Sequence, residues 1–96
     1  MSNFQINDII QCYGNTDNNG NIIFVETLGN GVITAIDIIY NTACVSWAPA
    51  PTLSDRPNLS NLNNFIYKSH KVCKKIADND WVDKDGNRYN DAGIKQ

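Results

Sequence analysis

Apolar and polar residues alternate along much of this chain in short runs bounded by asparagine, aspartate and glycine. This pattern is typical of β-strands joined by turns. The β-branched and aromatic content of the runs also favours extended backbone over helix. The runs predict five strands, at residues 4–13, 21–28, 32–40, 43–47 and 65–69. We therefore expect a mainly all-β fold.

Turn-forming residues separate these strands. Asn7-Asp8 predicts a bend or bulge inside the first strand. Asp17-Asn18-Asn19-Gly20 predicts a tight turn, because asparagine and glycine adopt positive φ at low cost. Gly29-Asn30-Gly31 predicts a sharp corner, and Asn41-Thr42 closes the third strand onto the fourth. One face of the fourth strand carries Ala43, Val45 and Trp47.

The second half of the chain is less regular. Residues 48–64 are predicted to form a long loop, either a packed connector or a binding loop, because loops beyond about 12 residues are usually functional or disordered. Residues 57–62 predict a helical or 3-10 turn within that loop, since Leu59 and Leu62 face one side. Residues 70–76 are predicted either to continue the last of the five strands, at 65–69, or to turn once as helix.

The end of the chain predicts a second small unit. Asp85-Gly86 is typical of the turn of a two-stranded hairpin, and Trp81 and Tyr89 would dock that hairpin, because isolated hairpins are marginally stable. We expect a barrel over residues 1–76 and a hairpin extension over residues 77–96 packed on it. From about Asn90 we expect fraying.

Composition and charge limit the function classes. A chain of 96 residues predicts one modest core, too small to combine with a deep catalytic cleft. The net charge of −2 gives no general attraction to phosphate, so nucleic acid is disfavoured as the main ligand. Fifteen asparagines against one glutamate suggest an AT-rich genome, such as that of a bacteriophage.

Cysteine usage and hydropathy indicate a cytoplasmic protein. The three cysteines, Cys12, Cys44 and Cys73, leave at least one unpaired, and no charged-then-apolar N-terminal segment predicts secretion. The apolar runs are far shorter than the roughly 20 residues that a membrane-spanning helix needs. We therefore expect localisation in the cytoplasm, and no contact with a membrane.

Three segments together resemble a known family of small barrels. They are Phe4-x-x-x-Asp8-Ile9-Ile10, the run from Leu28-Gly29-Asn30-Gly31 to Ile36, and Ala43-Cys44-Val45-Ser46-Trp47. The pattern resembles SH3-like barrels of the Tudor and KOW kind, including the Tudor-like domain at the C-terminus of bacterial superfamily 1 helicases. Asn7 stands where that pattern has glycine, and Leu28 where it has an aromatic residue. The resemblance implies a five-stranded barrel that binds protein or nucleic acid without chemistry of its own.

The sequence gives little support for catalysis or for metal binding. His70 is the single histidine, and no signature pairs it with a nucleophile, so we expect no catalytic residue. His70 and Cys73 have a zinc-like spacing, but residues three apart on a strand face opposite ways. Asp83-x-Asp85-Gly86-Asn87 misses the calcium-loop register. We expect no metal and no cofactor.

The leading functional hypothesis is a non-enzymatic protein-binding module. Its size, acidity and asparagine excess favour a phage-encoded inhibitor of a host protein. Trp and ordered prolines are typical of contact surfaces. The predicted contact residues lie around the long loop and at strand ends: Tyr40, Trp47, Pro49, Pro51, Arg56 and Tyr67.

Three alternatives remain open at this point. A nucleic-acid adaptor would use the basic cluster of Lys68, Lys71, Lys74 and Lys75. A small-molecule-binding or hydrolysing domain would need an enclosed pocket near His70 or the carboxylates. A cage of aromatic side chains for a cation would need Tyr13, Phe24, Tyr40, Trp47 or Tyr67 to converge around an exposed pocket.

Overall fold

The computed structural model describes residues 4–25, 29–40, 42–47, 65–67 and 70–96. Every regular element in these ranges is a strand, so the all-β prediction is confirmed. The strands are β1 (Ile9–Thr16), β2 (Ile22–Phe24), β3 (Gly31–Asp37), β4 (Thr42–Trp47), β5 (Ile66–Tyr67), β6 (His70–Ala77), β7 (Asp80–Val82) and β8 (Arg88–Tyr89). The helical turn expected at residues 57–62 and the rest of the long loop lie outside the described residues.

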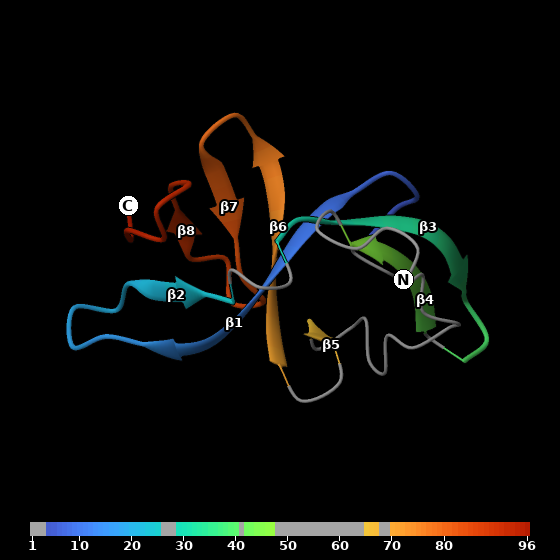
Figure 1. The fold of residues 1–96 in the computed structure, drawn as a ribbon, viewed down its shortest axis with the longest axis horizontal. Coiled ribbons are helices and arrows are strands. Elements are labelled where there is room, and N and C mark those ends of the chain that lie inside the picture. Colours follow the sequence, from blue (N-terminus) through green and yellow to red (C-terminus); the bar gives the residue numbers. More distant parts are fainter. Residues whose placement is uncertain (1–3, 26–28, 41, 48–64, 68–69) are drawn as a thin grey trace.

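All described pairings are antiparallel and form one sheet in the order β4-β3-β1-β6-β7-β8, with β2 beside β1 and β5 beside β6 (Figure 1). In the described part of the chain no pairing joins β4 to β8, so the sheet is open. The five-stranded SH3-like barrel therefore stays a prediction. The predicted boundary after residue 76 falls within β6, and β7 pairs with both β6 and β8.

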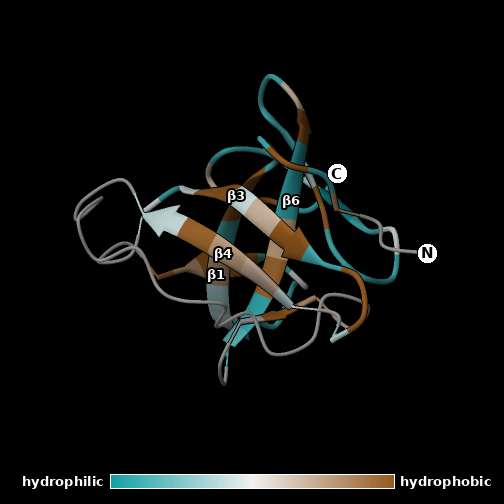
Figure 2. Ribbon diagram, turned by 90° about the vertical axis from the view of Figure 1, so that its right-hand side faces the viewer, coloured by the Kyte–Doolittle hydropathy of each residue, from teal (hydrophilic) through white to brown (hydrophobic). Residues whose placement is uncertain are grey.

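The pairing of β1 with β6 organises the core. Cys12 lies opposite Val72, and Gln11 lies opposite Cys73, so the two strands send alternate side chains to opposite faces. Both faces are covered, and Figure 2 shows the β3–β4 hairpin crossing in front of β1 and β6. Two clusters of buried residues result.

The larger cluster, the main core, is built from Phe4, Ile10, Cys12, Ile33, Ala43, Val45, Trp47, Phe65 and Val72. The second core contains Tyr13, Ile22, Cys73, Trp81 and Tyr89, with Ile9 and Phe24 packed against it. Ala43, Val45 and Trp47 all point into the main core, which confirms that they share one face of residues 43–47 and shows that this face is the buried one. The sheet therefore separates two small cores.

The predicted strand boundaries need three corrections. The first strand begins at Ile9, because Asn7 has a φ of 79° and the Gln5 amide bonds the Asp8 carboxylate at 2.7 Å, which makes residues 5–8 a turn. The turn after β3 occupies residues 38–40, because the Asp37 carboxylate accepts the amides of Ile39 and Tyr40 at 2.9 and 3.1 Å. Residues 70–76 are strand, but they do not continue the strand before them: β6 pairs antiparallel with β5, with Tyr67 opposite His70, so neither predicted alternative holds.

Three turns share one hydrogen-bond pattern. They span Asp17 to Asn21, Asp83 to Asn87, and Asn90 to Ile94. In each, the side-chain Oδ1 of the first residue accepts the amides two and four positions later, at 2.8 to 2.9 Å. The fourth residue is a glycine with a φ of 83°, 86° or 84°, a conformation that favours glycine. The sequence motif Asx-x-x-Gly therefore makes the same turn three times.

The third turn fixes the end of the chain. The Ile22 amide donates to the Gly93 carbonyl at 2.9 Å, and the Lys95 amide donates to Asn21 Oδ1 at 2.8 Å. A Cβ on Gly93 would lie 2.3 Å from the Ile22 carbonyl oxygen, so only glycine fits this contact. The fraying expected from Asn90 is wrong, because this segment is hydrogen-bonded to the start of β2.

Candidate protein-contact surface

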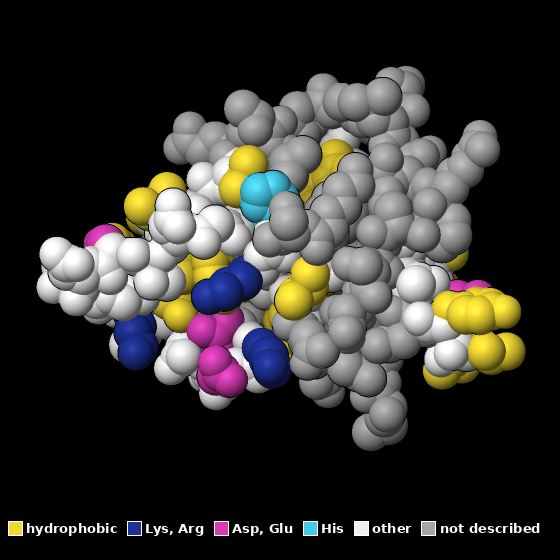
Figure 3. Space-filling view, turned by 90° about the horizontal axis from the view of Figure 1, so that it is seen from below, with side chains coloured by type: hydrophobic (Ala, Val, Ile, Leu, Met, Phe, Trp, Pro, Cys, Tyr) yellow, Lys and Arg dark blue, Asp and Glu magenta, His cyan; other side chains and the backbone are white. Residues whose placement is uncertain are grey.

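The β3–β4 hairpin ends in three consecutive exposed apolar residues. Ile38, Ile39 and Tyr40 are 81, 88 and 76% exposed. Figure 3 shows apolar side chains projecting at this end of the molecule. We call these three residues the apolar tip. Consecutive large apolar residues at such exposure are unusual on a protein surface that serves no contact.

The sheet explains why the apolar tip projects. β3 pairs with β1 only at Gly31 and Val32, whereas its pairing with β4 continues to Asp37 opposite Thr42. The end of the hairpin therefore extends beyond the strand that supports its base. The two bonds to the Asp37 carboxylate hold the backbone of the turn in place, so the tip is preorganised.

The electrostatic character of this hairpin is simple. Asp37 is the single charged residue between positions 29 and 47. The apolar tip therefore has a neighbouring negative charge and no neighbouring lysine or arginine in its own hairpin. Such a surface suits an apolar cleft with a neutral or basic rim.

Of the six predicted contact residues, Tyr40 alone is placed by the structure on this surface. Trp47 is 4% exposed and packs in the main core, so the prediction that it supplies the contact is corrected. The reason is that Gly31 lies opposite Trp47 and leaves room for the indole: a Cβ there would approach the ring to 2.7 Å. Tyr67 belongs to β5, paired with His70. Pro49, Pro51 and Arg56 lie outside the described residues.

The apolar tip contains two residues that sequence reasoning missed, Ile38 and Ile39. A signal was present, because a strand alternates its faces and cannot bury three consecutive apolar residues on one side. The preceding aspartate, which caps the turn in the structure, was a second signal. Extending the predicted strand to Tyr40 concealed both.

The basic cluster of the alternative hypothesis is divided between the two faces of β6. Lys74 Nζ lies 3.6 Å from Asp8 Oδ2 and 5.7 Å from the ring of Phe4. Lys75 lies on the opposite face, with its Nζ 5.9 Å from the Trp81 ring. Lys71 shares the face of Lys75, and Lys68 lies outside the described residues. The three described lysines therefore do not form one continuous basic face.

Two of the three cysteines are poorly suited to chemistry. Burial raises the pKa of the Cys12 and Cys73 thiols to about 12, so both stay protonated at neutral pH. Within the described residues, no three His, Cys, Asp or Glu side chains are grouped so that they could hold a metal ion. Nor does this part of the chain contain a helix long and apolar enough to cross a bilayer.

Comparisons with protein-family models, with curated proteins and with solved structures found no match for this chain. The resemblance to Tudor and KOW barrels is therefore carried by the quoted sequence segments alone. The physical character of the apolar tip is the remaining guide to function.

Proposed function

We propose that this protein is a non-enzymatic protein-binding module whose contact is the apolar tip of the β3–β4 hairpin. The observation that carries the proposal is the exposure of Ile38, Ile39 and Tyr40 on a turn that Asp37 holds in place. A preorganised loop loses little conformational entropy on binding. The SH3-like small barrel remains our interpretation of the scaffold.

The partner we propose is a protein with an apolar cleft. Fully burying an isoleucine side chain contributes about 1.5–3 kcal/mol, so the two isoleucines supply a few kcal/mol and tyrosine adds an amphipathic anchor. A lipid surface fits less well, because loops that dock on anionic membranes carry lysine or arginine beside their apolar residues. The charge on this hairpin is negative instead.

The size, acidity and asparagine excess that suggested a phage-encoded inhibitor support the same kind of partner. In that proposal the partner is a host protein met in the host cytoplasm. An inhibitor of this kind needs surface complementarity and no chemistry. The neutral thiols of Cys12 and Cys73 are compatible with it.

The test is a comparison of immobilised variants in a lysate of the source organism or its host. The double variant Ile38→Ser/Ile39→Ser should weaken binding of the specific partner by on the order of 100-fold, because the partner's cleft loses two buried side chains. Ile23→Ser is the matched control, since Ile23 is 58% exposed on β2, away from the tip. Mass spectrometry would identify the proteins that bind the wild type and the control but not the double variant.

Two results would contradict the proposal. One is a set of bound proteins that is identical for the wild type and the double variant, with the fold of both verified by thermal melting. The other is sedimentation of the wild type with phosphatidylcholine vesicles that the double variant abolishes, which would assign the tip to a membrane.

A further inference from the structure

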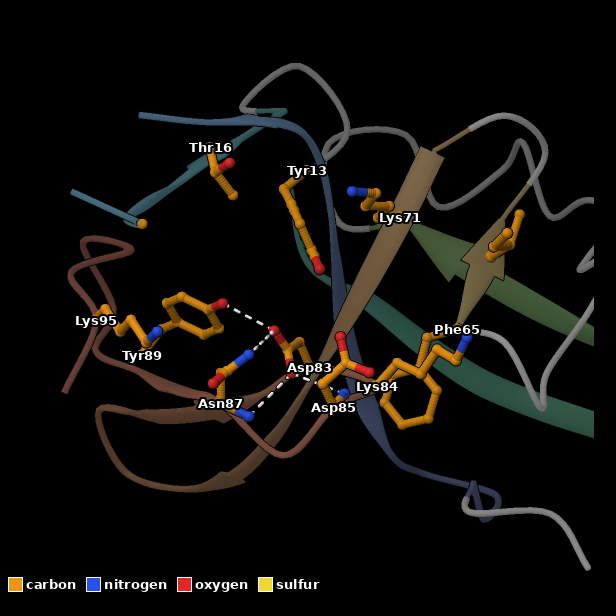
Figure 4. A pocket seen from close by; sticks show the side chains of 12 residues that line it. Tyr13, Thr16, Phe65, Lys71, Asp83, Lys84, Asp85, Asn87, Tyr89 and Lys95 are labelled. Atoms are coloured by element: carbon orange, nitrogen blue, oxygen red, sulfur yellow. Dashed lines mark hydrogen bonds between the residues drawn. The ribbon is translucent and has the colours of Figure 1, made fainter. Parts of the chain in front are cut away.

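A cavity of about 630 Å³ lies where the second core reaches the surface, and Phe65 of the main core also lines it. The end of β1, β5 with the start of β6, the Asp83 turn and the C-terminal segment line it (Figure 4). Its volume falls within the range of small-molecule sites, about 300–1,000 Å³. The cavity is separate from the apolar tip.

Two buried tyrosines line this cavity and differ in their hydrogen bonding. The Tyr89 hydroxyl donates to Asp83 Oδ2 at 2.8 Å. Tyr13 is 6% exposed, yet its hydroxyl forms no hydrogen bond with any residue in the described ranges. Figure 4 shows the Tyr13 hydroxyl directed into the cavity. A buried hydroxyl without a partner costs free energy, and a ligand in the cavity would remove that cost.

The buried carboxylate of Asp83 does not accept a hydrogen bond from the Tyr13 hydroxyl. It already accepts from Tyr89, from the Asp85 amide and from both the amide and the side chain of Asn87, at 2.8 to 3.1 Å. Burial alone would raise the pKa of Asp83, but the hydrogen bonds from Tyr89 and Asn87 outweigh it and lower the pKa. Asp83 is therefore an ionised and fully bonded part of the wall.

The Tyr13 hydroxyl is a neutral donor. Burial, together with the nearby charge of Asp83, raises its pKa to about 12, so it keeps its proton at physiological pH. The charges of the lining are three lysines, Lys71, Lys84 and Lys95, against Asp83 and Asp85. No ion pair joins these three lysines to a carboxylate within the described parts of the chain. Since lysine only donates, the uncommitted groups of the cavity are mainly donors.

We propose that this cavity binds a small organic anion, a carboxylate or phosphate on a flat apolar body, which accepts a hydrogen bond from Tyr13 and is attracted by the lysines of the rim. Phe65 and Tyr89 supply aromatic walls for the apolar body. The lysines come from β6, the Asp83 turn and the C-terminal segment, so a bound anion would join three parts of the chain. This activity goes beyond the contact at the apolar tip and does not depend on it.

The experiment is an NMR titration of the full chain with phenyl phosphate, with benzoate and with neutral benzamide. One or both anions should give saturable shifts of amides around Tyr13 and Asp85, with benzamide at least roughly ten-fold weaker because it lacks the charge. The anion that binds more tightly shows whether the cavity prefers a phosphate or a carboxylate group. Tyr13→Phe should weaken binding of the anion by roughly ten-fold, and Lys71→Gln should weaken it by several-fold.

Control variants test whether the loss of anion binding is specific to the cavity. Tyr40→Phe, at the exposed tip, and Lys75→Gln, whose side chain lies over Trp81, should leave anion binding unchanged. Tyr13→Phe should melt at or above the wild-type temperature, since it removes a buried hydroxyl that has no partner among the described residues, whereas Tyr89→Phe should melt lower. The proposal is overturned if neither anion binds, if benzamide binds as tightly, or if Tyr13→Phe binds as the wild type does.

Discussion

The turns at Asp17 and Asp83 are the same structure in two environments. Asp17 Oδ1 accepts amides at 2.8 and 2.9 Å, and Asp83 Oδ1 accepts the equivalent amides at 2.9 Å each. In both turns the asparagine four positions later donates its side-chain amide to Oδ2, at 3.1 Å. The Asp17 turn is exposed at the end of the β1–β2 hairpin, whereas Asp83 is 7% exposed and also accepts from Tyr89.

The difference separates what a local motif determines from what its surroundings add. Each turn completes its own bonds within five residues, so its shape needs no tertiary contact. Burial makes the aspartate indispensable, because solvent cannot replace it as the acceptor for Tyr89. The Asp17 turn ends a hairpin, and the Asp83 turn forms one wall of a cavity.

The largest expected effect is the contrast between Asp83→Ala and Asp17→Ala. Asp83→Ala leaves the buried Tyr89 hydroxyl and two turn amides without their acceptor, and we expect a loss of about 3 kcal/mol in the free energy of unfolding. Asp17→Ala exposes the equivalent amides to water, so its loss should be several-fold smaller. Urea unfolding of both variants measures the contrast. Equal losses would show that burial of the Asp83 turn adds nothing.

The glycine of the motif should behave alike in both turns, with a smaller effect. Gly20 and Gly86 have φ values of 83° and 86°, and an added Cβ meets nothing closer than 3.4 Å, the end of the flexible Lys95 side chain at Gly20. Gly20→Ala and Gly86→Ala should each cost about 1–2 kcal/mol, the price of a left-handed conformation for alanine. Urea unfolding tests this, and a much larger loss at Gly86 would show that its turn is strained by its surroundings.

Local sequence was sufficient for two of the three Asx-x-x-Gly turns and for most strands. The Asp-x-x-Gly pattern placed Gly20 and Gly86 in turns, and alternation placed Val45 on the same face as Ala43. The same alternation put Trp47 on the face of Val45 but did not say which face is buried, and Trp47 was predicted as a contact residue from the general preference of interfaces for Trp. Gly31, which makes room for the indole, was read as a corner residue alone.

The rest depends on pairings between distant parts of the chain. The pairing of β1 with β6 places Cys12 opposite Val72, and periodicity carries no information about which strands pair. For the same reason the cavity was not predictable: Tyr13, Asp83 and Lys95 meet only because β1, the Asp83 turn and the C-terminal segment come together. The apolar tip was within reach of sequence reasoning, since residues 38–40 violate strand alternation.

The smallest expected effect is a difference in acid sensitivity. The pKa of Asp83 is lowered in the folded protein, because hydrogen bonds from Tyr89 and Asn87 outweigh the effect of burial. Folding therefore favours the ionised form, and this stabilisation is complete above the unfolded pKa of about 3.9 and is lost as the pH falls through the folded pKa. Asp83→Asn should flatten the loss of stability between pH 5 and about pH 2 relative to the wild type, measured by urea unfolding at each pH.

Asp17→Asn should flatten this loss less, because solvent screens that exposed carboxylate, although its own pKa is also lowered by hydrogen bonds from Asn21 and Asn19. Identical profiles for Asp83→Asn and the wild type would mean that the charge of Asp83 contributes nothing to folding, and the distinction between the two turns would then rest on the geometry of their hydrogen bonds alone.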